Sequence, residues 1–122
     1  MKDYFASAAA YYAQYRPFYP DALIGDIVDF FRLTKDTRVL DIGSGTGQLA
    51  IQLSRFCKEV IAVEVDTDMI VEGKKLCQQH SVGNIRWIHS GAEDLPSVPG
   101  LGQFHLASFG ASFHWMPHDQ LL

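Results

Sequence analysis

The chain has 122 residues, a formal net charge of −4 at neutral pH and a hydrophobic fraction of 48%. This length allows one small domain. No window approaches the ~18 uninterrupted apolar residues of a membrane span, so no membrane association is predicted. The "ASAAA" segment near the N-terminus follows no apolar signal core, which makes the cytoplasm the expected location. A dedicated nucleic-acid-binding protein normally carries a basic patch, so the negative charge predicts no nucleic-acid partner.

The cysteines and histidines predict neither a disulfide nor a metal site. Cys57 and Cys77 are the only cysteines, and two thiols make neither a disulfide framework nor a zinc site. They are predicted to be buried and reduced. Pro117 disrupts a helical pairing of His114 with His118, and no cysteine or acid completes a ligand set.

Residues 1–34 are predicted to form an aromatic arm followed by one helix. In the arm, "YYAQYRPFYP", Pro17 and Pro20 disfavour a continuous helix. Segment 21–33 then places apolar residues at helical spacing opposite acids and an arginine, which predicts an amphipathic helix of about three turns. The residues expected to face inward are Leu23, Ile24, Ile27, Phe30 and Phe31.

Residues 35–122 alternate between strand and helix patterns. The expected strands are "RVLDIG" (38–43), "EVIAVEV" (59–65), "IRWIHSG" (85–91) and "FHLASFGASF" (104–113). One helix is expected to open at Thr46 or Gly47, and a second to run from a Thr67 cap to about His80. The inward residues expected on these helices are Leu49, Ala50, Leu53, Phe56, Cys57, Met69, Ile70, Gly73, Leu76 and Cys77. Such alternation predicts an α/β fold with a parallel sheet and right-handed crossovers.

The stretch "VLDIGSGTGQLA" (39–50) forms the first strand-to-helix turn, where parallel sheets bind ligands. Gly43, Gly45 and Gly47 allow the backbone to approach a ligand closely. Glu64 ends the second strand 21 residues after Gly43, near the ~20-residue offset at which an acid binds ribose hydroxyls. A tight turn with a solvated acid is the alternative, but strand, glycines, helix and acid in register favour a ligand site.

The same stretch is a poor match to a pyrophosphate site. A dinucleotide fingerprint reads G-x-G-x-x-G, whereas here the third glycine comes one residue early and Asp41 stands at the end of the strand. A carboxylate beside a phosphate costs on the order of 1–4 kcal/mol at ~4 Å. The turn therefore predicts a nucleoside with a positively charged tail, and S-adenosylmethionine, with its ammonium and sulfonium groups, is such a ligand.

Four segments, "VLDIGSGTGQLAIQLS", "VIAVEVDTDMI", "SGAEDLP" and "FGASFHWM", resemble successive motifs of the class I, Rossmann-like S-adenosylmethionine-dependent methyltransferases. The "YRPFYP" segment (15–20) and the "HW" pair resemble a subgroup that acts mostly on small molecules. The resemblance, over residues 11–118, implies a doubly wound parallel sheet truncated to four strands in the order 3-2-1-4. It also implies a methyltransferase enzyme with S-adenosylmethionine as cofactor and a small-molecule substrate.

The resemblance also implies roles for individual residues. Those expected around the cofactor are Asp41, Gly43, Ser44, Gly45, Gly47, Glu64, Val65, Met69, Ala92, Glu93 and Phe109. Among them Glu64 would take the ribose hydroxyls, while Val65 and Met69 would pack on the adenine. Gly91 stands where many relatives have an aspartate that contacts the adenine amino group.

Two further groups of residues are expected near the substrate. Tyr11, Tyr15 and Arg16 lie where relatives place a lid, with a surface-packing arm as the alternative. His114 and Trp115 would face the substrate cavity. His114 is the candidate general base, because imidazole titrates near neutral pH, and a substrate-shaping histidine is the alternative.

Four strands are fewer than the seven of the related fold, which suggests a fragment. Strand 104–113 would then be an open edge and one sheet face would be uncovered, and either would favour self-association. A catalytically incomplete cofactor-binding or regulatory module is the alternative function. A nicotinamide-dependent oxidoreductase is a third, disfavoured by Asp41 and by the position of the third glycine.

Overall fold

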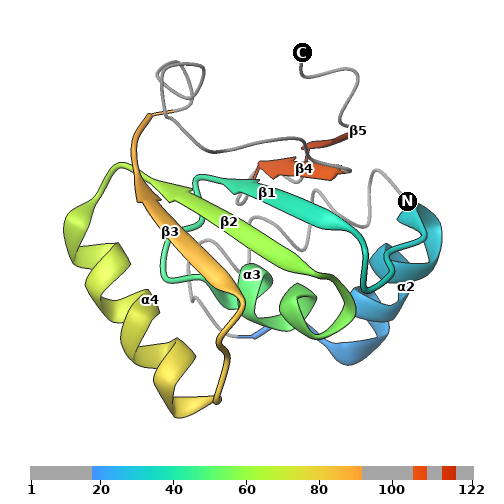
Figure 1. The fold of residues 1–122 in the computed structure, drawn as a ribbon, viewed down its shortest axis with the longest axis horizontal. Helices are drawn as coiled ribbons and strands as arrows, with labels where there is room; N and C mark the ends of the chain where they lie inside the picture. The colour runs from blue at the N-terminus through green and yellow to red at the C-terminus, as the bar shows by residue number, and fades with distance from the viewer. Residues whose placement is uncertain (1–17, 92–105, 110–113, 118–122) are drawn as a thin grey trace.

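The computed structural model describes residues 18–91, 106–109 and 114–117, the last two ranges as backbone only. The strands are β1 (Arg38–Ile42), β2 (Glu59–Glu64), β3 (Ile85–His89), β4 (Leu106–Phe109) and β5 (His114–Pro117). They form one sheet in the order β3-β2-β1-β4-β5 (Figure 1). The pairings β1–β2, β1–β4 and β2–β3 are parallel, which confirms the predicted parallel α/β sheet.

The fourth predicted strand differs from its prediction. It is divided into β4 and a separate β5, which pairs with β4 in the antiparallel sense, with Phe109 opposite His114 and Leu106 opposite Pro117. β4 therefore has a neighbour on each side, and the expected open edge at 104–113 is wrong. The predicted self-association through that strand loses the unpaired backbone groups that it required.

The described helices are α2 (Asp21–Phe31), α3 (Gln48–Leu53) with a 3-10 turn at Ser54–Phe56, and α4 (Thr67–Gln79). α2 and α3 pack on one face of the sheet, where Val39, Val60 and Ala62 are completely buried against them (Figure 1). Among the described helices, none is long and apolar enough to cross a membrane.

The opposite face of the sheet carries a smaller core of Leu40, Ile61 and Val63. These three side chains are at most 4% exposed. The apolar face that the sequence predicts to be uncovered is therefore not exposed at these three positions, and the predicted self-association through it stays a prediction.

At the end of α2 the side chains depart from the predicted pattern of inward-facing residues. Phe30, predicted to face inward, is 64% exposed and meets Phe31 edge-on. Arg32 adopts a left-handed conformation (φ 55°), and the Leu33 N–H donates to the Val28 carbonyl, so Leu33 turns back into the core.

The other two helices deviate at single positions. Phe56 is 41% exposed because the chain tightens into the 3-10 turn, which moves this residue away from the α-helical stripe. At α4 the capping residue is Asp66 rather than Thr67, since the Asp66 carboxylate accepts from the Asp68 N–H at 2.9 Å. A carboxylate at this position also suits the positive end of the helix dipole.

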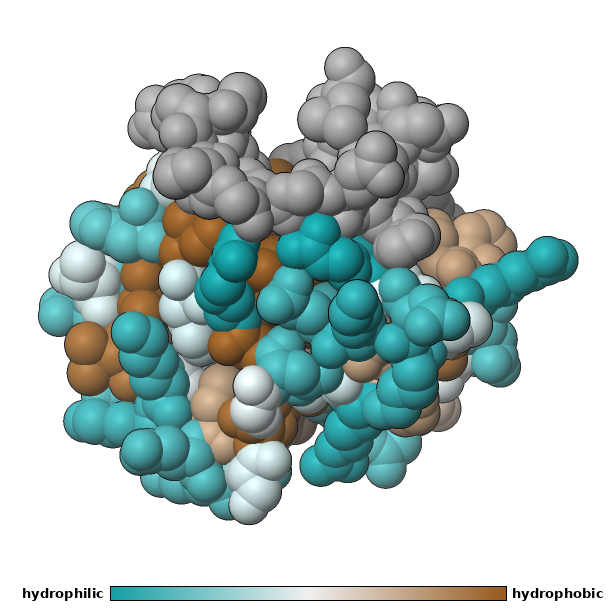
Figure 2. All heavy atoms as spheres, viewed as in Figure 1, coloured by the Kyte–Doolittle hydropathy of each residue, from teal (hydrophilic) through white to brown (hydrophobic). Residues whose placement is uncertain are grey.

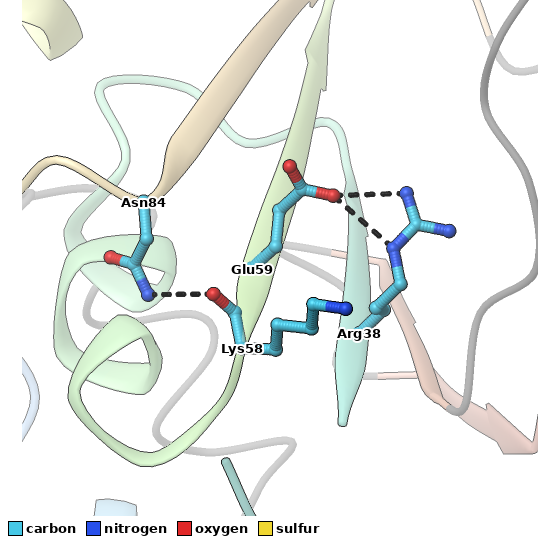
Figure 3. Close-up of polar contacts among 4 residues, drawn as sticks. All are labelled: Arg38, Lys58, Glu59 and Asn84. Atoms are coloured by element: carbon cyan, nitrogen blue, oxygen red, sulfur yellow. Dashed lines mark hydrogen bonds and ion pairs between the residues drawn. The ribbon is translucent and has the colours of Figure 1, made fainter. Parts of the chain in front are cut away.

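The amino ends of the strands are joined by side chains (Figure 3). Arg38 donates to Glu59 Oε1 from Nε at 3.2 Å and from Nη2 at 2.9 Å. Asn84 Nδ2 donates to the carbonyls of Ser54, Cys57 and Lys58 at 2.8, 3.4 and 3.3 Å. These contacts tie β1, β2 and the start of β3 together at the end of the sheet far from the glycine turn.

Candidate functional site

The turn between β1 and α3 depends on its glycines. Gly43, Gly45 and Gly47 have φ values of 72°, 60° and 88°, all in the left-handed region. A residue with a Cβ loses roughly 1–2 kcal/mol there. Gly47 is also the N-cap of α3, one of the two residues predicted to begin that helix. The glycine turn, residues 43–47, thus places at the carboxyl end of β1 a left-handed backbone that glycine adopts without strain.

The backbone N–H groups of this turn are bonded inside the protein. Gly43 N and Ser44 N donate to the Val63 carbonyl at 2.8 and 3.1 Å, and Gly47 N donates to Ser44 O at 3.0 Å. Gly45 N donates to Glu64 Oε1 at 2.7 Å. A phosphate-binding turn directs such N–H groups at the anion. Here the same donors end on protein oxygens.

Glu64 connects the glycine turn to α4. The residue is 9% exposed and ends β2. Its Oε1 accepts from Gly45 N, and its Oε2 accepts from Asp66 N at 2.9 Å. An ionised carboxylate has about four lone-pair positions, so two such bonds leave acceptor capacity for ligand hydroxyls. The ribose role of Glu64 stays a prediction, but its carboxylate is held beside the turn.

Asp41 brings a second carboxylate to this edge of the sheet. It is completely buried in β1, between Ala62 of β2 and Ser108 of β4. Its carbonyl accepts from Ser44 Oγ at 2.6 Å, which closes the start of the turn. Its Oδ2 makes no hydrogen bond within the described part of the chain, although the residue has other interactions. The carboxylates of Asp41 and Glu64 thus both lie at the end of the sheet where the turn begins.

Val65 and Met69 follow Glu64 into α4. Val65 is 63% exposed, and Met69 is partly buried. The Val65 carbonyl is 2.8 Å from His89 Nε2, which joins the ends of β2 and β3. An exposed apolar side chain beside Glu64 suits the predicted contact with an adenine, which stays a prediction. In Figure 2 the described surface is mainly hydrophilic, with apolar side chains showing between polar ones on the side of β3 and α4.

The remaining predicted site residues divide into two groups. Phe109 and His114 are opposite one another at adjoining ends of β4 and β5, and Phe109 also pairs with Ile42, the residue before the glycine turn. The backbone of His114 and the following Trp115 is thereby brought to the same edge of the sheet as the turn. The predicted residues outside the described ranges are Tyr11, Tyr15, Arg16, Ala92 and Glu93.

The two thiols are structural in the described chain. Cys57 and Cys77 are free and buried, as predicted. Burial raises the pKa of the Cys57 thiol to about 11. Burial also raises the pKa of Cys77, and the neighbouring Trp87 partly offsets this. No group of three metal-ligating side chains converges among the described residues.

Trp87 is a site residue that the sequence did not reveal. Its six-membered ring lies against the glycine turn and α4: a Cβ on Gly47 would come within 2.8 Å of it, and a Cβ on Gly73 within 2.3 Å. The only signal in the sequence is the alternation of β3, which puts Trp87 on one face with Ile85. That pattern does not say which glycine an aromatic ring contacts.

Comparison with known proteins gives a consistent family. Residues 39–122 match the methyltransferase domain family. The chain is 33% identical over 91 residues to a probable S-adenosylmethionine-dependent methyltransferase of Saccharomyces cerevisiae, covering 74% of this chain and 31% of that protein. The first curated relatives are covered over only 31% to 40% of their length.

Two solved structures illustrate the fold. The YcgJ protein of Bacillus subtilis superposes with a TM-score of 0.63 at 26% identity, over 74% of this chain and 38% of that one. The tRNA methyltransferase TrmI of Aquifex aeolicus gives 0.64 at 25% identity, over 76% and 37%. These neighbours confirm the Rossmann-like fold.

The prediction that excludes nucleic acid is wrong. TrmI acts on tRNA by its name and shares this fold, so an RNA substrate is compatible with it. The prediction failed because net charge is a sum over the chain, whereas a substrate meets a local surface.

Proposed function

Because the chain belongs to the methyltransferase domain family, we propose that it binds S-adenosylmethionine at the glycine turn and serves methyl transfer to a small molecule. The observation that carries the cofactor part is the internal bonding of the turn. Four of its backbone N–H groups are bonded to protein oxygens, and the carboxylates of Asp41 and Glu64 lie at the same edge. Such a site repels a pyrophosphate and favours a ligand that is neutral at its sugar and cationic at its tail.

The residues of the turn would act by binding and orienting. Glu64 is already fixed by Gly45 N and Asp66 N, so its carboxylate can accept ribose hydroxyls without first losing side-chain freedom. Asp41 would supply negative charge toward the ammonium and sulfonium end. When bound, S-adenosylmethionine supplies an electrophilic methyl group on a positively charged sulfur. The contribution of the chain is positioning, which accounts for a large part of the rate in such displacements.

The small-molecule part of the proposal is supported by sequence resemblance. "YRPFYP" (15–20) and the His114–Trp115 pair resemble the subgroup that acts mostly on small molecules. In this proposal Tyr11, Tyr15 and Arg16 form a lid and His114 is a general base, needed only where the acceptor must lose a proton. The alternative, a cofactor-binding or regulatory module, would bind the cofactor without methyl transfer.

The binding experiment compares S-adenosylhomocysteine with NAD by calorimetry on the full chain. We expect S-adenosylhomocysteine to bind and NAD to bind far more weakly. Glu64→Gln should weaken S-adenosylhomocysteine binding by roughly tenfold, because an amide presents only one acceptor oxygen. Glu72→Gln is the matched control, since Glu72 is exposed on α4 and pairs only with Lys75 at 3.4 Å among the described contacts. Equal binding of NAD, or an unchanged affinity in Glu64→Gln, would contradict the cofactor assignment.

The substrate experiment measures transfer of a labelled methyl group to small carboxylate- or hydroxyl-bearing molecules and, in parallel, to RNA. Transfer to a small acceptor supports the proposal. Transfer to RNA alone overturns the small-molecule part. Cofactor binding without methyl transfer to either kind of acceptor favours the alternative function, a cofactor-binding or regulatory module.

A further inference from the structure

Trp87 lies where the glycine turn, α4 and β3 meet. We infer that it is a positioning residue for the cofactor site, because the edge of its indole ring holds the glycine turn in shape. This inference rests on the proposed function of the turn. It concerns a residue whose observed contact is with the glycine turn itself.

Trp87 of β3 contacts both the glycine turn, at Gly47, and α4, at Gly73. We call this set of three residues the Trp87 junction. A Cβ on Gly47 would lie 2.8 Å from Cη2 and 2.9 Å from Cζ2 of the indole, and a Cβ on Gly73 would lie 2.3 and 2.4 Å from the same atoms. Cβ atoms essentially never come this close to another heavy atom. The Gly73 Cβ would also approach the Thr46 carbonyl at 3.1 Å, so α4 lies directly against the turn. One ring edge therefore occupies the space that side chains at both glycine positions would need.

Trp87 and Glu64 contact the turn at two different residues. Glu64 accepts the Gly45 N–H, and two residues later Gly47, at φ 88°, lies against the indole. Gly47 also caps the start of α3, because its carbonyl accepts from Ile51 N at 2.8 Å. A change at position 87 would therefore alter where Gly45 and its bond to Glu64 lie.

The polar end of the indole indicates that shape, more than stability, is what this side chain supplies. Trp87 Nε1 is buried and has no hydrogen-bond partner of ordinary geometry in the described part of the chain. The Cys77 thiol beside it is a weak acceptor at best. A buried N–H without a good acceptor lowers stability, and a phenyl ring would avoid that cost. What an indole offers here beyond a phenyl ring is the edge that reaches Gly47 and Gly73.

A matched pair of helical glycines tests the packing. Gly73→Ala in α4 and Gly25→Ala in α2 make the same change, but no atom of the described residues lies within 4 Å of a Cβ at position 25. Alanine favours a helix over glycine, so Gly25→Ala should keep or raise the melting temperature. Gly73→Ala should lower it by several degrees and weaken S-adenosylhomocysteine binding, because the new methyl group must displace the ring or the turn.

Trp87→Phe supplies the rescue, since phenylalanine lacks the ring atoms that meet Gly73. In the Gly73→Ala background it should restore both the melting temperature and the affinity toward those of the Trp87→Phe single variant. Alone it should leave the chain folded, weaken S-adenosylhomocysteine binding by roughly tenfold, and speed hydrogen exchange at the Gly45 N–H. That last readout follows the Gly45–Glu64 bond in the absence of any ligand.

Each outcome decides one point. If Gly73→Ala changes the melting temperature and S-adenosylhomocysteine binding no more than Gly25→Ala does, the contact of Trp87 with Gly73 is wrong. If Trp87→Phe binds S-adenosylhomocysteine as wild type does and Gly45 exchange is unchanged, Trp87 packs there without positioning the turn. If the wild-type chain itself does not bind S-adenosylhomocysteine, the proposed function fails, while melting temperatures and Gly45 exchange still decide the junction.

Discussion

The two ends of the parallel strands are held together in different ways. At the amino ends, Arg38 is paired with Glu59 (Figure 3). Asn84 donates to three carbonyls, of which Figure 3 shows that of Lys58. At the carboxyl ends, Glu64 is held by backbone N–H groups in the described structure. The amino end thus balances its charge within the protein, whereas the carboxyl end keeps the Glu64 carboxylate beside the glycine turn. We therefore expect the amino ends of the strands to contribute to stability and the carboxyl ends to bind the ligand.

The largest effect on the free energy of unfolding should come from a substitution at Gly47, at the carboxyl ends of the strands. Gly47→Ala combines a φ of 88° with a Cβ 2.8 Å from Trp87, and we expect it to lower the free energy of unfolding by about 3 kcal/mol. Gly43→Ala, at φ 72° and with no described residue within 4 Å of the new Cβ, should cost only about 1–2 kcal/mol. Urea denaturation of both variants measures the difference. Equal losses would mean that backbone strain alone, without the indole contact, governs the turn.

A smaller effect is expected at the amino end. Asn84→Ala leaves the carbonyls of Ser54, Cys57 and Lys58 without this donor, and should cost about 1–2 kcal/mol of unfolding free energy. Its affinity for S-adenosylhomocysteine should equal that of the wild type, in contrast to Glu64→Gln. A loss of affinity in Asn84→Ala would show that the two ends are coupled and would remove the distinction between them.

The last effect appears only at alkaline pH, and it involves Cys57, whose carbonyl is one of the three that Asn84 contacts. Burial raises the Cys57 pKa from 9.0 to about 11. Because the folded pKa lies above the unfolded one, this stabilising contribution is constant below pH 9 and is lost as pH rises from 9 to 11. In a Cys77→Ala background, the wild-type residue at 57 should give a steeper decline over that range than Cys57→Ala. Parallel curves would show that the thiol ionises as readily in the folded chain as in the unfolded one.

Much of the described fold was predictable because its elements are periodic. The apolar run of β2, the stripe of α2 and the glycines after β1 each follow from local spacing, and the family match agrees with the resemblance found in the motifs. β5 was missed because four residues containing a proline give no periodic signal. The predictions that Phe30 and Phe56 face inward were wrong because each residue lies where regular α-helix gives way to a tighter or left-handed backbone.

The site was predictable only in part. The residues that shape the turn are adjacent in sequence, so Asp41, Gly43 and Gly47 could be selected from it. The contact of Trp87 with Gly47 and Gly73 joins residues that lie 40 and 14 positions apart, through a packing geometry that no local pattern encodes. The internal use of the turn's N–H groups likewise depends on Val63 and Glu64 in a neighbouring strand.

The internally bonded glycine turn also bears on kinetics. Its backbone is already fixed by the Val63 carbonyl and the Glu64 carboxylate, so an arriving molecule has little loop motion left to freeze. The turn itself should therefore add no slow step to association, and any plateau in the association rate at high ligand concentration would arise outside residues 43–47.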